Sequence, residues 1–113
     1  MNKFELYTMI FMTLDFYWDT HKGDDLGMFL SSMNPFLFKD IGSAVPNVYH
    51  EYEEWIDERK ISVKNSYCIA KEYIASVNEN YISEAFAWVT EEEWIAKCKK
   101  YLETDHKGAE LPD

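Results

Sequence analysis

Two short patterns in the sequence have the residue types of a metal site. His50 and Glu51, followed by Glu54, match part of the H-E-x-x-H zinc motif, but a glutamate takes the place of the second histidine. A zinc site needs three or four protein ligands, so a further group would have to come from elsewhere in the chain. On a helix over residues 47–59, His50 shares its arc with an expected face of five carboxylates: Glu51, Glu53, Glu54, Asp57 and Glu58. We therefore expect a solvent-exposed histidine at this position and no metal ligand.

The second pattern is Glu103-x-x-His106, which has the Glu-x-x-His spacing found in di-iron helical bundles. Those sites need another such pair on a second helix, with both pairs projecting inward. The sequence contains only one pair, in a polar stretch near its last residues. We predict that the spacing is a coincidence.

The two cysteines could act as nucleophiles only beside a base and an anion-binding turn. Cys68 and Cys98 form no CxxC pair and are too few for a disulfide framework, which favours a reduced, cytoplasmic setting. Cys98 lies on an apolar stripe, the usual place of an unreactive buried thiol, whereas Cys68 lies nearer the polar side of its helix. Because no glycine turn or anion hole accompanies either thiol, we expect neither cysteine to be a nucleophile.

Carboxylates between residues 15 and 25 form the third candidate group. Asp15 and Asp19 lie one helical turn apart, and Asp24 and Asp25 follow in a stretch that contains glycine. Paired carboxylates can do acid–base chemistry or bind a hard cation, but the spacing of a calcium-binding loop is absent. A helix cap by Asp24 or Asp25 explains the second pair. We therefore predict no metal and no cofactor, and favour capping or partner contact.

The elements that must position these residues are helical. Apolar residues at i, i+3, i+4 and i+7 predict helices within 4–18, 26–33, 47–59, 64–77 and 81–89, and a last helix after Thr90. Pro46 fits the first turn of its helix, Asn34-Pro35 stops the second helix, and Thr90 with Glu93 has capping-box spacing. We expect an all-α fold, a single compact bundle of five to six helices over residues 1–103. Residues 104–113 are expected to be a flexible C-terminal tail.

The stretch 21–45 is the least regular part of the chain. After Asn34-Pro35 it contains a run of apolar residues: Phe36, Leu37, Phe38 and Ile41. Because apolar residues in a loop normally avoid water, we expect a partly buried loop that is pinned across the helices.

Charge and hydropathy exclude several classes of partner. The chain has 113 residues, 21 acidic and 11 basic, for a net charge of −10. Such a protein repels phosphate backbones and anionic lipid, so we expect no nucleic acid and no membrane partner. The apolar run 6–14 is far shorter than the about 20 residues that cross a bilayer. We therefore expect a buried helix that neither acts as an export signal nor spans a membrane.

The excess of acid lies in one stretch. Residues 15–58 hold ten acidic and two basic residues, a net charge of −8. The 19 aromatic residues leave room for a few exposed ones, such as Phe36, and exposed aromatics beside acids are typical of a protein-binding hot spot. The predicted partner-binding residues are Asp15, Asp19, Asp24, Asp25, Asp40, Glu51, Glu54, Asp57, Glu58, Tyr17, Trp18 and Tyr49.

Three segments resemble a known family. They are residues 23–43, with the run N-P-F-L-F-K-D-I-G-S at 34–43 followed by Pro46, Tyr49 and Tyr52, then S-Y-C-I-A-K-E-Y at 66–73 and E-E-E-W-I at 91–95. Together they resemble small immunity proteins encoded beside bacterial contact-dependent growth inhibition and other polymorphic toxins, over roughly residues 5–102.

The resemblance implies an inhibitor and not an enzyme. Such a protein stays in the cytoplasm of the producing cell. It would bind the C-terminal toxin domain delivered by a neighbour, as a 1:1 heterodimer, and block or cover the toxin's active site. Many such toxins are nucleases with basic clefts. Two alternatives remain open on the residues alone. One is an acidic adaptor or regulatory subunit for another basic protein. The other is a metal-binding helical bundle that uses His21, His50, His106 and carboxylates.

Overall fold

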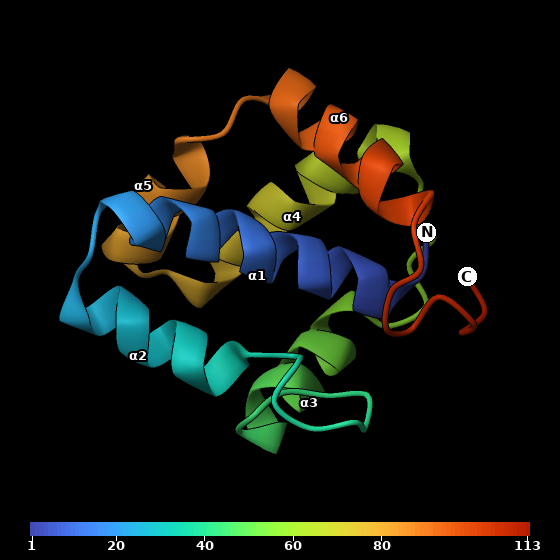
Figure 1. The fold of residues 1–113 in the computed structure, drawn as a ribbon, viewed down its shortest axis with the longest axis horizontal. Helices are drawn as coiled ribbons and strands as arrows, with labels where there is room; N and C mark the ends of the chain where they lie inside the picture. Colours follow the sequence, from blue (N-terminus) through green and yellow to red (C-terminus); the bar gives the residue numbers. More distant parts are fainter.

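Six α-helices and no strands make up the computed structural model, which describes all 113 residues (Figure 1). The prediction of a compact all-α bundle of five to six helices is confirmed. No helix in the chain is both long and apolar enough to reach across a bilayer. The helices are α1 (Lys3–Thr20), α2 (Asp24–Met33), α3 (Pro46–Ile56), α4 (Val63–Val77), α5 (Asn80–Ala87) and α6 (Glu91–Leu102).

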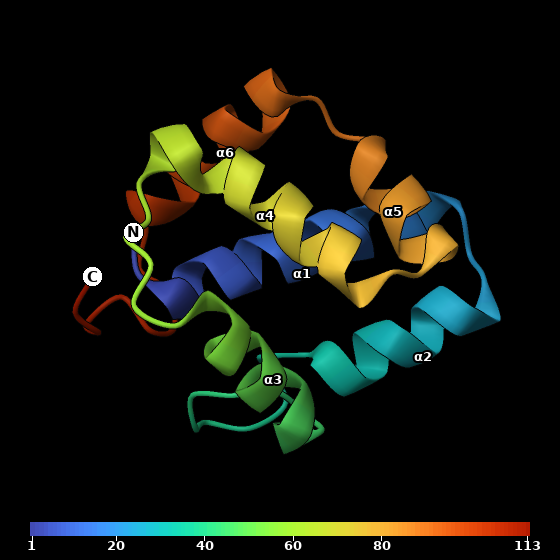
Figure 2. The same cartoon turned by 180° about the vertical axis from the view of Figure 1, so that it is seen from behind.

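Helix α1 lies at the centre of the bundle. It packs against α2, α3, α4 and α5, while α6 packs mainly on α4. Figures 1 and 2 show α1 between α2 and α3 on one side and α4, α5 and α6 on the other. Between Phe4 and Leu14, every side chain except that of Met12 is buried. A helix that is apolar all round is stable only when it is enclosed on all sides, which is what its neighbours provide.

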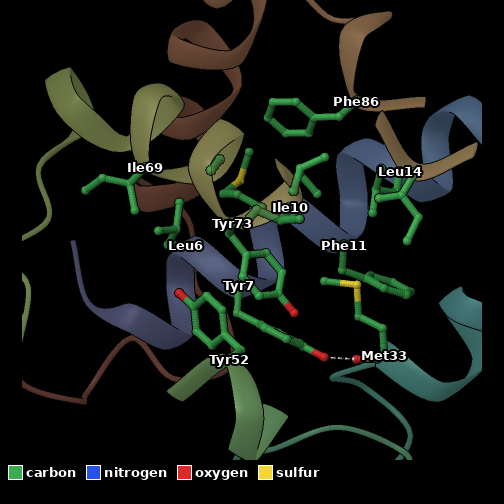
Figure 3. Close-up of a cluster of buried hydrophobic side chains, with 14 of the residues drawn as sticks. Leu6, Tyr7, Ile10, Phe11, Leu14, Met33, Tyr52, Ile69, Tyr73 and Phe86 are labelled. Carbon is green, nitrogen blue, oxygen red and sulfur yellow. Dashed lines mark hydrogen bonds between the residues drawn. The ribbon is translucent and has the colours of Figure 1, made fainter. Parts of the chain in front are cut away.

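Aromatic side chains form the part of the core that joins α1 to α2 and α3 (Figure 3). The ring centroid of Tyr7 lies 4.9 Å from those of both Tyr49 and Tyr52, in edge-on geometry. The Tyr7 hydroxyl donates to the backbone carbonyl of Met33 at 2.7 Å, so it fixes the last residue of α2 against α1. The Tyr52 hydroxyl donates to the Lys3 carbonyl at 2.6 Å. Both hydroxyls are therefore satisfied inside the core.

The expectation that Tyr49 is an exposed partner-binding residue is wrong. Its side chain is buried against Phe4 and Tyr7. The buried face of α3 has i, i+3, i+7 spacing and comprises Tyr49, Tyr52 and Ile56. The apolar spacing of this helix also includes Val48 and Trp55. In the structure these two side chains lie at the edge of the buried face and are only partly buried.

Local signals set most helix ends as expected. Thr90 and Glu93 form the predicted capping box, Pro46 opens α3, and Asn78 ends α4 in the left-handed conformation. The expected cap by Asp24 or Asp25 is wrong, because Gly23 is the N-cap of α2 and no side chain caps it. Both aspartates instead lie in the first turn, where the helix dipole favours negative charge.

Residues 104–113, expected to be a flexible tail, fold back over the first turn of α1. The Asn2 side-chain amide donates to the Gly108 carbonyl at 2.9 Å, and the His106 Nε2 atom lies 2.6 Å from Glu5 Oε2. Gly108 is buried with a φ of 87°, and a side chain there would clash with the ring of Phe4. Polar groups of this segment therefore bind the first turn of α1 and the residue before it.

The contact between His106 and Glu5 makes the stability of the tail depend on pH. Burial by itself lowers the pKa of His106, but hydrogen bonds to the Glu5 carboxylate and the Thr104 carbonyl outweigh it and raise the pKa above the ordinary 6.5. A histidine whose pKa is raised by folding stabilises the folded state fully below about 6.5. That contribution is lost as the pH rises through the raised pKa.

We expect the wild-type protein to lose more thermal stability between pH 5.5 and pH 8.5 than His106→Gln, which cannot gain this proton. The matched control is His50→Gln, since His50 is exposed and lies 2.9 Å from a glutamate on its own helix. Thermal unfolding followed by circular dichroism at several pH values measures the difference. The same pH dependence in wild type and His106→Gln would contradict the assignment.

Candidate partner-binding surface

Residues 34–45 form a closed loop between α2 and α3, called here the 34–45 loop. Its two ends are joined, because the Ala44 amide donates to the Asn34 carbonyl at 2.9 Å and the Val45 amide donates to the Ser32 carbonyl at 3.0 Å. The Asn34 side chain accepts from the Phe36 amide at 2.7 Å and fixes the first turn. A loop with joined ends and internal hydrogen bonds has the character of an Ω-loop, a type that is often functional.

The 34–45 loop is partly buried, as expected, but its apolar run is exposed, so the expectation that these side chains avoid water is wrong. The exposed fractions are 48% for Phe36, 61% for Leu37, 59% for Phe38 and 39% for Ile41. Buried contacts are confined to the base of the loop, at Pro35 and Ser43. Figures 1 and 2 show the loop at the edge of the molecule beside α3, with no element covering it. The rule that apolar loop residues are buried therefore fails here.

Lys107 holds the 34–45 loop from the C-terminal segment. Its Nζ atom donates to the carbonyls of Pro35 and Phe38, each at 2.6 Å. Burial lowers the pKa of Lys107, and the nearby Asp40 carboxylate partly opposes that shift. This contact could not be predicted from the sequence, because Lys107 lies about 70 positions from the carbonyls that it binds.

A cavity of about 540 Å³ opens between α1 and α2. Trp18 forms one wall, and its indole Nε1 donates to the Gly23 carbonyl at 3.1 Å. Gly27 lets α2 approach this ring, since a β-carbon there would lie 3.1 Å from the indole nitrogen. Asp15 and Asp24 supply carboxylates to the lining, which also includes Phe11, Met28, Leu30 and Asn34.

The carboxylate of Asp15 is incompletely neutralised within the protein. Partial burial raises its pKa, the neighbouring Asp19 carboxylate raises it further, and Lys22 offsets only part of the effect. The Lys22 Nζ atom instead lies 3.8 Å from the centroid of the Trp18 ring. A cation from outside the chain could therefore pair favourably with the Asp15 carboxylate in this cavity.

A second cavity, of about 370 Å³, lies between the 34–45 loop and α3. Asp40 and Glu53 bring carboxylates to it, and Phe38 and Ile41 form part of its apolar lining. Asn34 lines this cavity and the cavity between α1 and α2, so the base of the loop separates the two.

The acidic residues of α3 do not form the single five-carboxylate face expected from the sequence. The helix ends at Ile56, so Asp57 and Glu58 lie beyond it, with Asp57 at a φ of 51°. Three of the glutamates have partners within the chain: Glu51 accepts from Asn47 at 3.0 Å, Glu53 pairs with Lys3 at 2.8 Å, and Glu54 pairs with His50 at 2.9 Å. By contrast, Asp15 and Asp19 of α1 and Asp24 and Asp25 of α2 form no ion pair within the chain, where the five ion pairs lie elsewhere.

A separate group of rings, in which Tyr17 is partly buried and Trp88 is exposed, lies where α1 meets α5. The Tyr17 ring stacks on His21 with centroids 4.3 Å apart, and Trp88 packs edge-on to both. Trp88 is exposed and is the C-cap of α5, which ends at Ala87.

The residues of the metal-like patterns are held by other contacts. His50 pairs with Glu54, as an exposed histidine on the charged arc would, and His106 pairs with Glu5 and not with Glu103. No three histidine, cysteine or carboxylate side chains lie close enough together to hold one metal ion. Burial raises the pKa of the Cys98 thiol to about 12, which leaves it protonated, whereas Cys68 is exposed.

No protein-family model, no curated protein and no solved structure matches the chain.

Removing the Lys107 ammonium should loosen the 34–45 loop without unfolding the bundle. We expect the amides of Ala44 and Val45, which close the loop, to exchange with solvent at least about 10-fold faster in Lys107→Met, since a hydrogen bond to a charged group contributes about 1.5–3 kcal/mol. Hydrogen exchange followed by NMR measures this. The control is the exposed Lys99→Met. Unchanged exchange in Lys107→Met would show that the loop is held by other contacts.

Proposed function

We propose that the chain is an immunity protein of a contact-dependent growth inhibition or related polymorphic toxin system. It binds the C-terminal toxin domain in a 1:1 complex in the cytoplasm of the producing cell and neutralises it without catalysis of its own. The proposal rests on the resemblance of the segments at 23–43, 66–73 and 91–95. One structural observation supports it most strongly: exposed carboxylates lie beside the 34–45 loop, whose apolar side chains are exposed to solvent.

The charge distribution supports a basic partner. Of the net charge of −10, residues 15–58 contribute −8. Asp19, Asp24, Asp25 and Asp40 within that stretch are exposed. Complementary charge of this kind accelerates association, up to about 10⁸–10⁹ M⁻¹s⁻¹ at low salt. Close charge pairs in such interfaces couple by about 1.5–7 kcal/mol.

A nuclease domain fits this surface because its cleft must be basic to bind phosphates. Carboxylates on the inhibitor can take the places of those phosphates, while exposed aromatic side chains slow dissociation. The same features would also serve an adaptor for a different basic protein. Gene context separates these two candidates, since a large upstream gene with a variable 3′ end favours a toxin–immunity pair.

The proposal predicts a tight 1:1 complex with the protein fragment encoded immediately upstream. Its association rate should fall as salt concentration rises, because steering by exposed charges is screened. We expect reversal of three exposed acids, Asp19→Lys with Asp24→Lys and Asp25→Lys, to weaken the affinity at least about 10-fold, mainly through slower association. Co-purification followed by surface plasmon resonance at several salt concentrations measures both effects.

A matched control reverses three exposed acids outside the acidic stretch: Glu79→Lys, Glu103→Lys and Glu110→Lys. It changes the net charge by the same amount and should weaken the affinity less. Failure of the wild-type protein to bind the fragment at low salt would refute the proposed function.

A further inference from the structure

We propose that the partner docks on one continuous face, the 34–45 loop together with the cavity between α1 and α2. The loop buries its apolar tip against the partner, and the cavity receives an arginine or lysine side chain from it. This inference rests on the proposed function, because the occupant is a basic protein. It goes further in two ways. It places the partner on the acidic groups of α1 and α2 and not on those of α3, and it states that the partner's surface is basic with an apolar centre.

The loop tip has the properties of a preformed anchor. Four apolar side chains, those of Phe36, Leu37, Phe38 and Ile41, are exposed within a stretch of six residues. The loop keeps its shape without burying them, because the joined ends and the Lys107 hydrogen bonds fix its backbone. A preorganised segment loses little conformational entropy on binding, so more of the apolar burial appears as affinity.

The tip and the cavity belong to the same face. The ring of Phe36 packs edge-on to that of Phe11, with centroids 5.9 Å apart, and Phe11 lines the cavity. Asn34 at the base of the loop lines it as well. Met28, which is 71% exposed, extends the apolar surface along α2 at the cavity. One partner surface can therefore cover both features.

Charge complementarity identifies the occupant. Carboxylates flank the tip on both sides, with Asp15 and Asp24 in the α1–α2 cavity and Asp40 in the cavity toward α3. A second copy of the chain would bring like charges together across the same face, and an anionic membrane would be repelled. A basic protein with an apolar centre in its binding surface fits both the tip and its acidic flanks.

The cavity suits a long cationic side chain. Trp18 offers a rigid aromatic wall, and the position of Lys22 on its ring shows that the indole already attracts a cation. Asp15 and Asp24 can pair with the charged end, while the aliphatic stem lies against apolar lining. Arginine fits best, because its planar guanidinium stacks on aromatic rings and binds carboxylates in bidentate fashion.

The other candidate faces are less suitable. On α3, Glu51, Glu53 and Glu54 are already paired within the chain. The exposed Phe16 lies beside a smaller cavity whose lining includes Lys97 but no carboxylate, so nothing there would pair with a cationic side chain.

The cavity can be tested with a small probe, Nα-acetyl-arginine amide, and its neutral isostere Nα-acetyl-citrulline amide as control. We expect a saturable NMR shift of the Trp18 indole N–H with the arginine compound only. The shift should be lost in Asp15→Asn with Asp24→Asn, a pair of substitutions that keeps side-chain shape. An equal response to citrulline amide, or no response of Trp18 to arginine amide, would overturn the assignment of the cavity.

The loop is tested with the upstream-encoded fragment as partner. We expect Leu37→Ser with Phe38→Ser to weaken binding at least about 30-fold, as removal of an interface hot spot does, and Phe16→Ser to change it less than about 3-fold. All three side chains are exposed, so the fold should survive. Tight binding that is unchanged in the loop variant would overturn the docking face and leave the proposed function standing.

Two further outcomes separate the inference from the function. A fragment that fails to bind, with Trp18 still responding to arginine amide, would refute the toxin partner and support the cationic cavity. Binding of the wild type to phosphatidylcholine vesicles, or self-association in sedimentation velocity, would overturn the choice of a basic protein if the loop variant abolished it.

Discussion

Burial of residues 4–14 of α1 constrains every other element of this protein. Four helices pack against α1, and the C-terminal segment covers its first turn through Asn2 and Glu5. Once α2 and α3 are both fixed on α1, the chain between them must turn within twelve residues at the edge of the bundle. The 34–45 loop is the result. Its base is buried with the core, while the apolar side chains of its tip stay exposed, although the Phe36 ring contacts Phe11 of α1.

Contacts from distant parts of the chain give this loop a defined shape. The Tyr7 hydroxyl holds Met33 at the end of α2, and Lys107 holds two loop carbonyls. The side chains that this loop exposes to water are apolar. An exposed apolar patch lowers the solubility of the free protein and is typical of a binding surface. The carboxylates nearby are exposed or only partly buried, so their charge remains available to steer and select a basic partner.

The fold could be predicted from periodic apolar spacing and local end signals, as at Thr90, Asn78 and Pro46, because helix formation depends mainly on near neighbours in the sequence. Features that depend on tertiary contacts could not. Burial of Tyr49 depends on Phe4 and Tyr7, docking of the tail depends on Glu5, and exposure of the 34–45 loop depends on where its ends are held. Composition indicated an acidic surface, but only the structure separates the paired acids of α3 from those around the α1–α2 cavity.

The central claim is that a basic partner docks on the 34–45 loop and the adjoining cavity. Hydrogen–deuterium exchange of the chain, alone and saturated with the upstream-encoded fragment, tests it most directly. The account predicts that protection on binding is concentrated in residues 15–45, with little change in α3 and α6. Protection concentrated in α3 or α6, with residues 24–45 exchanging as in the free protein, would contradict it.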